Sequence, residues 1–238
     1  MTSAGVIDDR AGNGLPEKCA SCGALQRAIC GHLEGASLTR LSKVTRTQIV
    51  KRGQSILWQA EESPAVGVVQ SGILKLTMSL EDGREQTVGL AMTGDFVGRP
   101  MAAMSAHTVT AVTDAAICVV SRPVFEALEH ELPDIEHALV KQSFDELDRA
   151  RTWLLLLGRK SSKERVATFL KDLAEKHRDQ AGAIPLPLTR QEMAELLGLT
   201  IETVSRNLSA LKRAGIITLT SMRSFVVRQP DELARIAG

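Results

Sequence analysis

Short hydrophobic stretches separated by glycines run from about Thr45 to Arg122. They are rich in valine, isoleucine, leucine and threonine, and they include SILWQ, VGVVQ, ILKLTMSL, QTVGLAM, TVTAV and AAICVVS. Many short segments of this kind with regular turn signals are typical of the strands of an antiparallel sandwich or barrel. Glu81-Asp82-Gly83 predicts a hairpin turn between two of them. The pattern therefore predicts an all-β domain.

A helical period replaces this pattern after Pro123. One long helix is expected from Pro133 to about Gly158, because residues of one face recur at three- and four-residue steps: Val140, Ser143, Leu147, Ala150, Leu154 and Leu157. This spacing is that of a coiled-coil seam, so these residues form a predicted dimer interface. The same stripe also suits packing against the chain's own β-domain. A second apolar flank favours a helix with one face inward and one toward a partner: Ile135, Leu139 and Phe144.

Signals for two short helices lie between Leu188 and Gly215. Thr189 and Glu192 have the spacing of a capping box, which starts the first helix. Gly198 supplies a tight turn, and Thr200 caps a second helix that runs to about residue 214. Two helices joined by a turn that contains glycine make a helix-turn-helix.

The second of these helices has two distinct faces. Its apolar face is formed by Val204, Leu208 and Leu211, and its polar face by Glu202, Ser205, Arg206 and Ser209. Arg206 can donate to O6 and N7 of guanine, Glu202 can accept from the amino group of cytosine, and Ser205 can bond to either kind of base. Together with Thr200 at the helix start, the polar face is predicted to bind DNA in the major groove. Any amphipathic helix has a polar face, but Ile216–Leu219 and Phe225–Arg228 also predict a β-hairpin wing beside it.

Composition restricts the class of protein. The 238-residue chain has a net charge of +1, but the part after Gly158 has 14 basic and 9 acidic residues, which suits contact with a polyanion. The longest apolar run, Trp153–Leu157, is too short for a membrane helix, and no segment has the pattern of a signal peptide. We therefore expect a cytoplasmic protein. No nucleophile elbow, phosphate-binding glycine loop or paired histidine or carboxylate motif occurs, so an enzyme is not expected.

Three of the four cysteines lie close together as Cys19-x2-Cys22-x7-Cys30, and Cys118 lies in one of the expected strands. A chain without export signals favours metal or redox chemistry over disulfides. Four thiolates can ligate either a [4Fe–4S] cluster or a zinc ion. A lone strand cysteine is more often a small buried residue, but the N-terminal trio favours a ligand role for Cys118. His32 could replace one thiolate, although an exposed loop histidine without a ligand role is the simpler interpretation.

The run LTRQEMAELLGLTIETVSRNLSALKRAGII, residues 188–217, resembles the helix-turn-helix of the CRP/FNR transcription regulators. The resemblance covers residues 19–238 and includes GDFVG at 94–98. It implies an α+β fold, in which an N-terminal antiparallel β-roll (a cyclic-nucleotide-binding-like jelly roll) precedes a long dimerisation helix and a C-terminal winged helix-turn-helix. The expected divisions are a disordered stretch (1–18), a cluster-binding segment with the β-roll sensor domain (19–132), the dimerisation helix (133–160) and the DNA-binding domain (161–238).

Glu202, Ser205 and Arg206 match the Glu-x-x-Ser-Arg pattern of the FNR branch, which implies TTGAT-type half-sites arranged as an inverted repeat and bound by a homodimer. The cysteines resemble the cluster motif of that branch, although the second gap is longer than the best-known spacing. The resemblance implies that a [4Fe–4S] cluster is held by Cys19, Cys22, Cys30 and Cys118. Members that bind cyclic nucleotides have an arginine where this chain has Ala106-His107-Thr108, so no cyclic nucleotide is expected.

The resemblance implies an oxygen-responsive regulator, mainly an activator of anaerobic and microaerobic genes, that acts with RNA polymerase. An intact cluster is expected to tie the N-terminal segment to the β-domain and the long helix, which favours pairing of two subunits. Loss of pairing lowers DNA affinity, because the second half-site contact is then no longer intramolecular. The alternatives are a regulator of the same family with a structural zinc site, or with another β-domain ligand such as haem.

Overall fold

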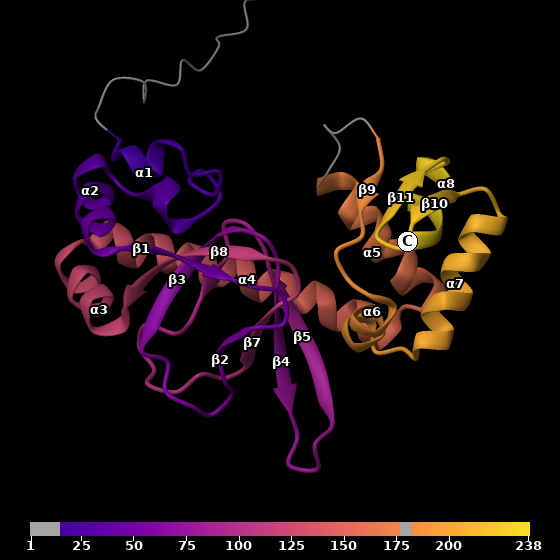
Figure 1. The fold of residues 1–238 in the computed structure, drawn as a ribbon, viewed down its shortest axis with the longest axis horizontal. Helices are drawn as coiled ribbons and strands as arrows, with labels where there is room; N and C mark the ends of the chain where they lie inside the picture. Colours follow the sequence, from indigo (N-terminus) through magenta and orange to yellow (C-terminus); the bar gives the residue numbers. More distant parts are fainter. Residues whose placement is uncertain (1–14, 177–181) are drawn as a thin grey trace, which may run out of the picture.

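The computed structural model describes residues 15–176 and 182–238. Figure 1 shows two lobes joined by one long helix, α4 (Pro133–Arg159). The first lobe contains the N-terminal helices and a β-roll, and the second lobe contains the C-terminal helices with a small sheet. The α+β arrangement expected from the sequence is confirmed.

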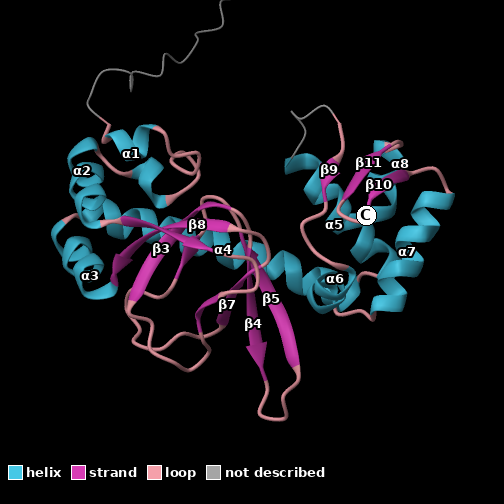
Figure 2. Ribbon diagram, viewed as in Figure 1, coloured by secondary structure: helices cyan, strands magenta, loops and turns pink. Residues whose placement is uncertain are grey.

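The β-roll consists of two four-stranded antiparallel sheets, which Figure 2 shows in magenta. One sheet has the order β1-β8-β3-β6 and the other β2-β7-β4-β5. The strands are β1 (Arg46–Val50), β2 (Ser55–Leu57), β3 (Ala65–Ser71), β4 (Leu74–Ser79), β5 (Glu85–Ala91), β6 (Phe96–Val97), β7 (Thr108–Ala111) and β8 (Ala115–Ser121). The predicted hairpin joins β4 to β5, and Gly83 adopts a φ of +84° that its missing Cβ permits.

A second hydrophobic core lies outside the roll, between the first sheet and the helices. The segment from α1 (Glu17–Ala20) through the 3₁₀ helix η1 (Ile29–His32) contributes Ala24, Ala28 and Ile29 to this core. The chain continues through α2 (Gly35–Val44), which the sequence reading did not predict. The expected disordered stretch falls mainly on residues 1–14, outside the described residues, but Glu17 and Lys18 belong to a helix.

Helix α4 follows α3 (Arg122–Glu131) and has both ends embedded and its middle exposed. Ile135 and Ala138 are buried in the core beneath the N-terminal segment, and Leu156 is buried in the core of the second lobe. The prediction that one flank of this helix faces inward holds for Ile135 but is wrong for Phe144, whose side chain is 63% exposed. Phe144 instead lines an open cavity between the roll and α4.

The second lobe is built from α5 (Ser162–Lys176), β9 (Ile184–Pro185), α6 (Arg190–Leu197), α7 (Ile201–Arg213), β10 (Ile217–Ser221), β11 (Ser224–Val227) and α8 (Pro230–Ala237). The wing predicted after the second short helix is the β10–β11 hairpin. The stretch before α6 also contains strand β9, which pairs with β11. The wing therefore belongs to a three-stranded sheet with the order β10-β11-β9.

Candidate DNA-reading helix and cysteine pocket

Local capping interactions set the geometry of α6 and α7. The Thr189 hydroxyl accepts from the backbone N–H of Glu192 at 3.1 Å, and the Glu192 carboxylate accepts from the N–H of Thr189 at 2.6 Å. This is the capping box that the sequence predicts. Gly198 closes the turn in the left-handed region with a φ of +61°, and Thr200 caps α7 by accepting from Thr203 N–H. The predicted helix-turn-helix is therefore present.

The two faces of α7 separate as the sequence predicts. Val204, Leu208 and Leu211 are buried in the lobe core. Of the residues assigned to DNA, Thr200, Glu202, Arg206 and Ser209 are exposed and Ser205 is half-buried. Hydrogen bonds from its own backbone N–H and from the Thr200 side chain lower the pKa of Glu202, so this acceptor is ionised at neutral pH. The exposed side thus offers a cationic donor and an anionic acceptor one helical turn apart.

All four cysteines line one pocket between the N-terminal segment and the first sheet of the roll. Cys118 lies on the central strand β8, opposite Thr47 of β1 and Val68 of β3. Cys22 and Cys30 pack against the core that Ala24, Ala28 and Ile29 form with the roll. The pairing of β8 with its neighbours therefore places Cys118 beneath a loop that lies almost a hundred residues earlier in the chain.

The pocket suits a group with several thiolate ligands. All four cysteines are free of disulfides. Burial, followed by the neighbouring Cys118, Cys19 and Cys22 sulfurs, raises the pKa of Cys30 to about 12. Burial and Cys118 also raise the pKa of Cys19. Without a positive centre these side chains are therefore protonated, and ligand binding must release their protons. Lys18 and Arg46 also line the pocket, and they supply positive charge next to thiolates.

Two kinds of metal site use four cysteine thiolates. Within residues 15–176 and 182–238, no three histidine, cysteine, aspartate or glutamate side chains converge closely enough to hold one metal ion. A zinc ion needs four donors at about 2.0–2.3 Å from a single point. In a [4Fe–4S] cluster each thiolate binds a different iron, so the four sulfurs lie farther apart. Four thiolates lining one pocket are a donor set that either kind of site can use.

The cysteine segment contacts α4 directly, through residues that the sequence reading missed. Helix η1 packs against α4, and the carboxylate of Asp134 in the first turn of α4 accepts from Glu34 N–H and from the Ser37 hydroxyl, both at 2.9 Å. These contacts bring the start of α2 onto α4. Asp134 lies about a hundred residues from its partners Glu34 and Ser37, so no local sequence pattern predicts these hydrogen bonds.

A turn of the roll forms a second connection. Gly94 has a φ of +100°, and a Cβ at this position would lie 2.6 Å from Cβ of Arg27 in the cysteine segment. The Gly94 carbonyl accepts from Gln142 Nε2 of α4 at 3.2 Å, and Asp95 pairs with Arg149 of α4 at 3.2 Å. The GDFVG turn therefore touches both the cysteine segment and the long helix.

The predicted seam on α4 is mostly exposed. Side chains of Val140, Ser143, Leu147, Ala150 and Leu154 face solvent, and the exposed fraction reaches 70% for Leu154. Leu157 differs from the other five, because it is half-buried against the core of its own second lobe. Five residues of the seam are therefore available to a partner.

A cavity of about 740 Å³ lies between the roll and the middle of α4. Ala106 and His107 line it, as do the seam residues Val140 and Leu147. Burial and the nearby Arg99 lower the pKa of His107, so this side chain is neutral at pH 7. Arg99 also lines the cavity, and sequence reasoning, which looked for a cation only near residue 107, overlooked it.

Comparison with known proteins gives consistent relatives. The Crp-like helix-turn-helix domain matches residues 164–236, and the cyclic nucleotide-binding domain matches residues 47–131. The transcriptional activator protein FnrL of Cereibacter sphaeroides is 41% identical over 93% of this chain and 92% of its own length. The fumarate and nitrate reduction regulatory protein of Escherichia coli is 26% identical over 92% of this chain and 90% of its own length.

Solved structures agree with this relationship. FixK2 from Bradyrhizobium japonicum superposes with a TM-score of 0.76 at 30% identity, covering 82% of this chain and 98% of FixK2. No helix in the two described ranges is long and apolar enough to cross a membrane. The two-domain match, the capped helix-turn-helix and the relatives together show that this chain is a transcription regulator of the CRP/FNR family, not an enzyme.

Proposed function

We propose that the protein is an oxygen-responsive regulator that binds TTGAT-type inverted repeats as a homodimer when a [4Fe–4S] cluster is held by Cys19, Cys22, Cys30 and Cys118. The single observation that carries this proposal is the pocket that all four cysteines line. The names of FnrL and of the fumarate and nitrate reduction regulatory protein support the same branch of the family. Regulation through RNA polymerase follows from the same resemblance.

When bound, the cluster supplies an oxygen-labile link among four thiolates. The chain's own part is to convert the position of the cysteine segment into a property of α4. Ile29 in that segment is 1% exposed and packs in one core with Ile135 and Ala138 of α4. Arg27 is held against the Gly94 turn, whose carbonyl binds Gln142. A displaced segment would remove both supports from the helix half that leads into the seam.

The exposed seam is the surface through which we propose that two subunits pair. Val140, Leu147 and Leu154 recur at seven-residue steps and present apolar surface to solvent. Pairing brings two reading helices to half-sites about one helical turn apart, which raises affinity because the second contact becomes intramolecular. The cysteine segment supports the helix before these residues, at Ile135 and Ala138, and the Gly94 turn bonds to Gln142 within the stretch that they span.

An anaerobic binding experiment tests the proposal. Protein purified without oxygen is mixed with a TTGAT-N4-ATCAA duplex under nitrogen and then exposed to air, while visible absorbance, iron and acid-labile sulfide are measured. We expect four irons and four sulfides per subunit, tight binding under nitrogen, and loss of both colour and binding in air. A colourless protein with one zinc per subunit and binding unaffected by air would establish the zinc alternative instead.

The dimer is tested separately by Leu147→Glu, with Leu155→Glu as the matched control, because Leu155 is an exposed leucine of α4 outside the seam, about 80° around the helix from Leu147. The control residue is the more exposed of the two, at 59% against 41%. A buried unpaired charge costs about 3–5 kcal/mol, so the seam variant is expected to sediment as a monomer under nitrogen. The control is expected to remain a dimer. Equal dissociation of both variants would place the interface elsewhere.

A further inference from the structure

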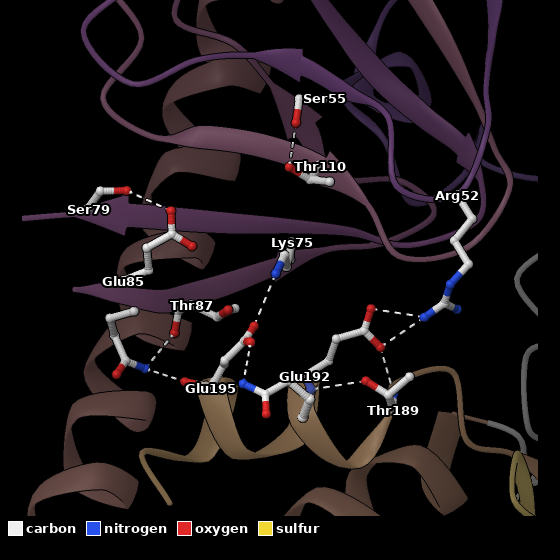
Figure 3. Close-up of polar contacts among 12 residues, drawn as sticks. Arg52, Ser55, Lys75, Ser79, Glu85, Thr87, Thr110, Thr189, Glu192 and Glu195 are labelled. Carbon is white, nitrogen blue, oxygen red and sulfur yellow. Dashed lines mark hydrogen bonds and ion pairs between the residues drawn. The ribbon is translucent and has the colours of Figure 1, made fainter. Parts of the chain in front are cut away.

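Helix α6, the first helix of the helix-turn-helix, lies against the β-roll of the same chain (Figure 1). Figure 3 shows the polar contacts between them, which join residues more than a hundred positions apart. They leave the outer side of α7 uncovered, because Glu202, Arg206 and Ser209 are exposed. The contact therefore does not block DNA.

The first contact uses the same carboxylate that caps α6. Nη2 of Arg52 lies 2.9 and 3.0 Å from the two carboxylate oxygens of Glu192. Burial opposes ionisation of Glu192, but hydrogen bonds from Thr189 and the nearby Arg52 prevail and lower its pKa. Arg52 is itself held in place, since its N–H donates to Asp114 at 2.9 Å.

The second contact is made by Glu195, one turn farther along α6. Its Oε2 lies 3.0 Å from Nζ of Lys75 on β4, and its Oε1 accepts from Gln191 at 2.8 Å. The Glu195 carbonyl oxygen accepts from Gln86 of β5 at 2.6 Å. The Lys75 and Glu195 side chains are only 21% and 28% exposed, so solvent screens this pair less than an ordinary surface pair.

Apolar packing accompanies these bonds. Val112 of the roll is buried in the core of the second lobe, and Ile73 and Leu90 pack against that core. The chain connects the lobes through Lys160 and Ser161, where the helix is interrupted between α4 and α5. Such a break does not by itself fix the direction of α7. The last turn of α4 is itself joined to the second lobe, because Leu156 is buried in its core and Arg165 donates to the carbonyls of Leu157 and Leu197. The contacts of α6 with the roll are a separate restraint on the orientation of α7.

We propose that Arg52 and Lys75 are positioning residues for DNA binding, which act through Glu192 and Glu195 to hold the reading helix at one orientation relative to α4. A two-fold dimer must present both reading helices at the spacing of its half-sites. If the DNA-binding lobe samples other orientations, the apparent affinity for DNA falls in proportion to the fraction of molecules in which the lobe is correctly oriented. This inference rests on the operator-binding part of the proposed function and not on the cluster.

The test is a charge swap in the full-length protein prepared without oxygen. Lys75→Glu is expected to weaken binding to the TTGAT duplex about tenfold, equivalent to about 1.4 kcal/mol. The double variant Lys75→Glu/Glu195→Lys has the wild-type net charge and is expected to return to within about twofold of wild-type affinity. Visible absorbance should be unchanged in both, because neither residue lines the cysteine pocket.

A neutralising pair separates positioning from the general attraction between positive charge and DNA. Arg52→Gln removes the interlobe contact, whereas Lys51→Gln removes the same charge from a neighbour that pairs with Asp114 inside the roll. We expect weaker binding only in Arg52→Gln. Hydrogen exchange, measured without DNA, should be faster at Lys160 in Arg52→Gln and unchanged in Lys51→Gln.

Equal loss in Arg52→Gln and Lys51→Gln, or a double variant as weak as Lys75→Glu, would overturn the proposal. Wild-type exchange at Lys160 in Arg52→Gln would also overturn it. Failure of the wild-type protein to bind the duplex would count against the operator assignment. Hydrogen exchange at Lys160 would still decide whether the contact between Arg52 and Glu192 restrains the DNA-binding lobe.

Discussion

The reading helix and the cysteine pocket are held together in opposite ways. The helix-turn-helix is made from contiguous residues with two side-chain caps, and its core contains Leu197 and Val204 with no exposed surface. The cysteine segment has only short helical pieces and contributes three buried residues of its own to a shared core. A compact helix-turn-helix beside a cysteine segment with few buried residues suits the proposed switch, since elements that move are drawn from the less stable parts of a structure.

The largest effect is expected from removing the ligand that joins the two parts of the pocket. Cys118→Ser should lose most of its iron, and its operator affinity under nitrogen should fall at least about a hundredfold, to the value of the wild type in air. Circular dichroism should show that the reader remains folded. Ser21→Ala, in the same N-terminal segment, is the control and should keep iron and affinity. Full iron in Cys118→Ser would remove this residue from the ligand set.

Two substitutions that create cavities, one in the cysteine segment and one in the helix-turn-helix, are expected to lower the free energy of unfolding by similar amounts. Ile29 and Leu197 are both almost fully buried, and each truncation to alanine should lower the free energy of unfolding by about 2–5 kcal/mol. Ile29→Ala is expected to reduce the ratio of operator affinities under nitrogen and in air, because it loosens the segment that supports α4. Leu197→Ala should weaken both affinities alike. Equal effects on the ratio would show that sensor and reader are not distinct.

A base-specific effect is expected at the reader alone. Arg206→Ala should weaken operator binding by about 1–3 kcal/mol, and replacing the guanine of TTGAT should then cost the variant almost nothing more. Arg228→Ala, at the wing, should still discriminate against the altered base. Undiminished discrimination in Arg206→Ala, measured by competition, would assign guanine to another residue.

The smallest effect concerns the coupling between the two regions. Gln142→Ala removes the hydrogen bond from α4 to the Gly94 carbonyl. The ratio of operator affinities under nitrogen and in air is expected to change by an amount equivalent to about 0.5–2 kcal/mol of coupling free energy. Asp145→Ala, at an exposed position of the same helix, should leave the ratio unchanged. A normal ratio in Gln142→Ala would mean that the direct contact of η1 with α4 carries the coupling.

The two regions also differ in how far sequence reasoning reached. The capping box of Thr189 and Glu192, the turn at Gly198 and the apolar side of α7 were all predicted, because each depends on residues three or four positions apart. Helix α2 and strand β9 were missed. Strand β9 is two residues long and exists through its pairing with β11, which local pattern cannot indicate.

Sequence alone determined the helix-turn-helix through short-range periodicity, the set of four candidate cysteine ligands through residue chemistry, and the fold class through the resemblance to the CRP/FNR regulators. Only the tertiary structure brought Cys118 beneath the N-terminal loop, exposed Phe144, buried part of Leu157 and joined Arg52 and Lys75 to α6. Those outcomes depend on strand register and on how two lobes meet. The free energy of such contacts comes from partners distant in the chain, so no local segment encodes them.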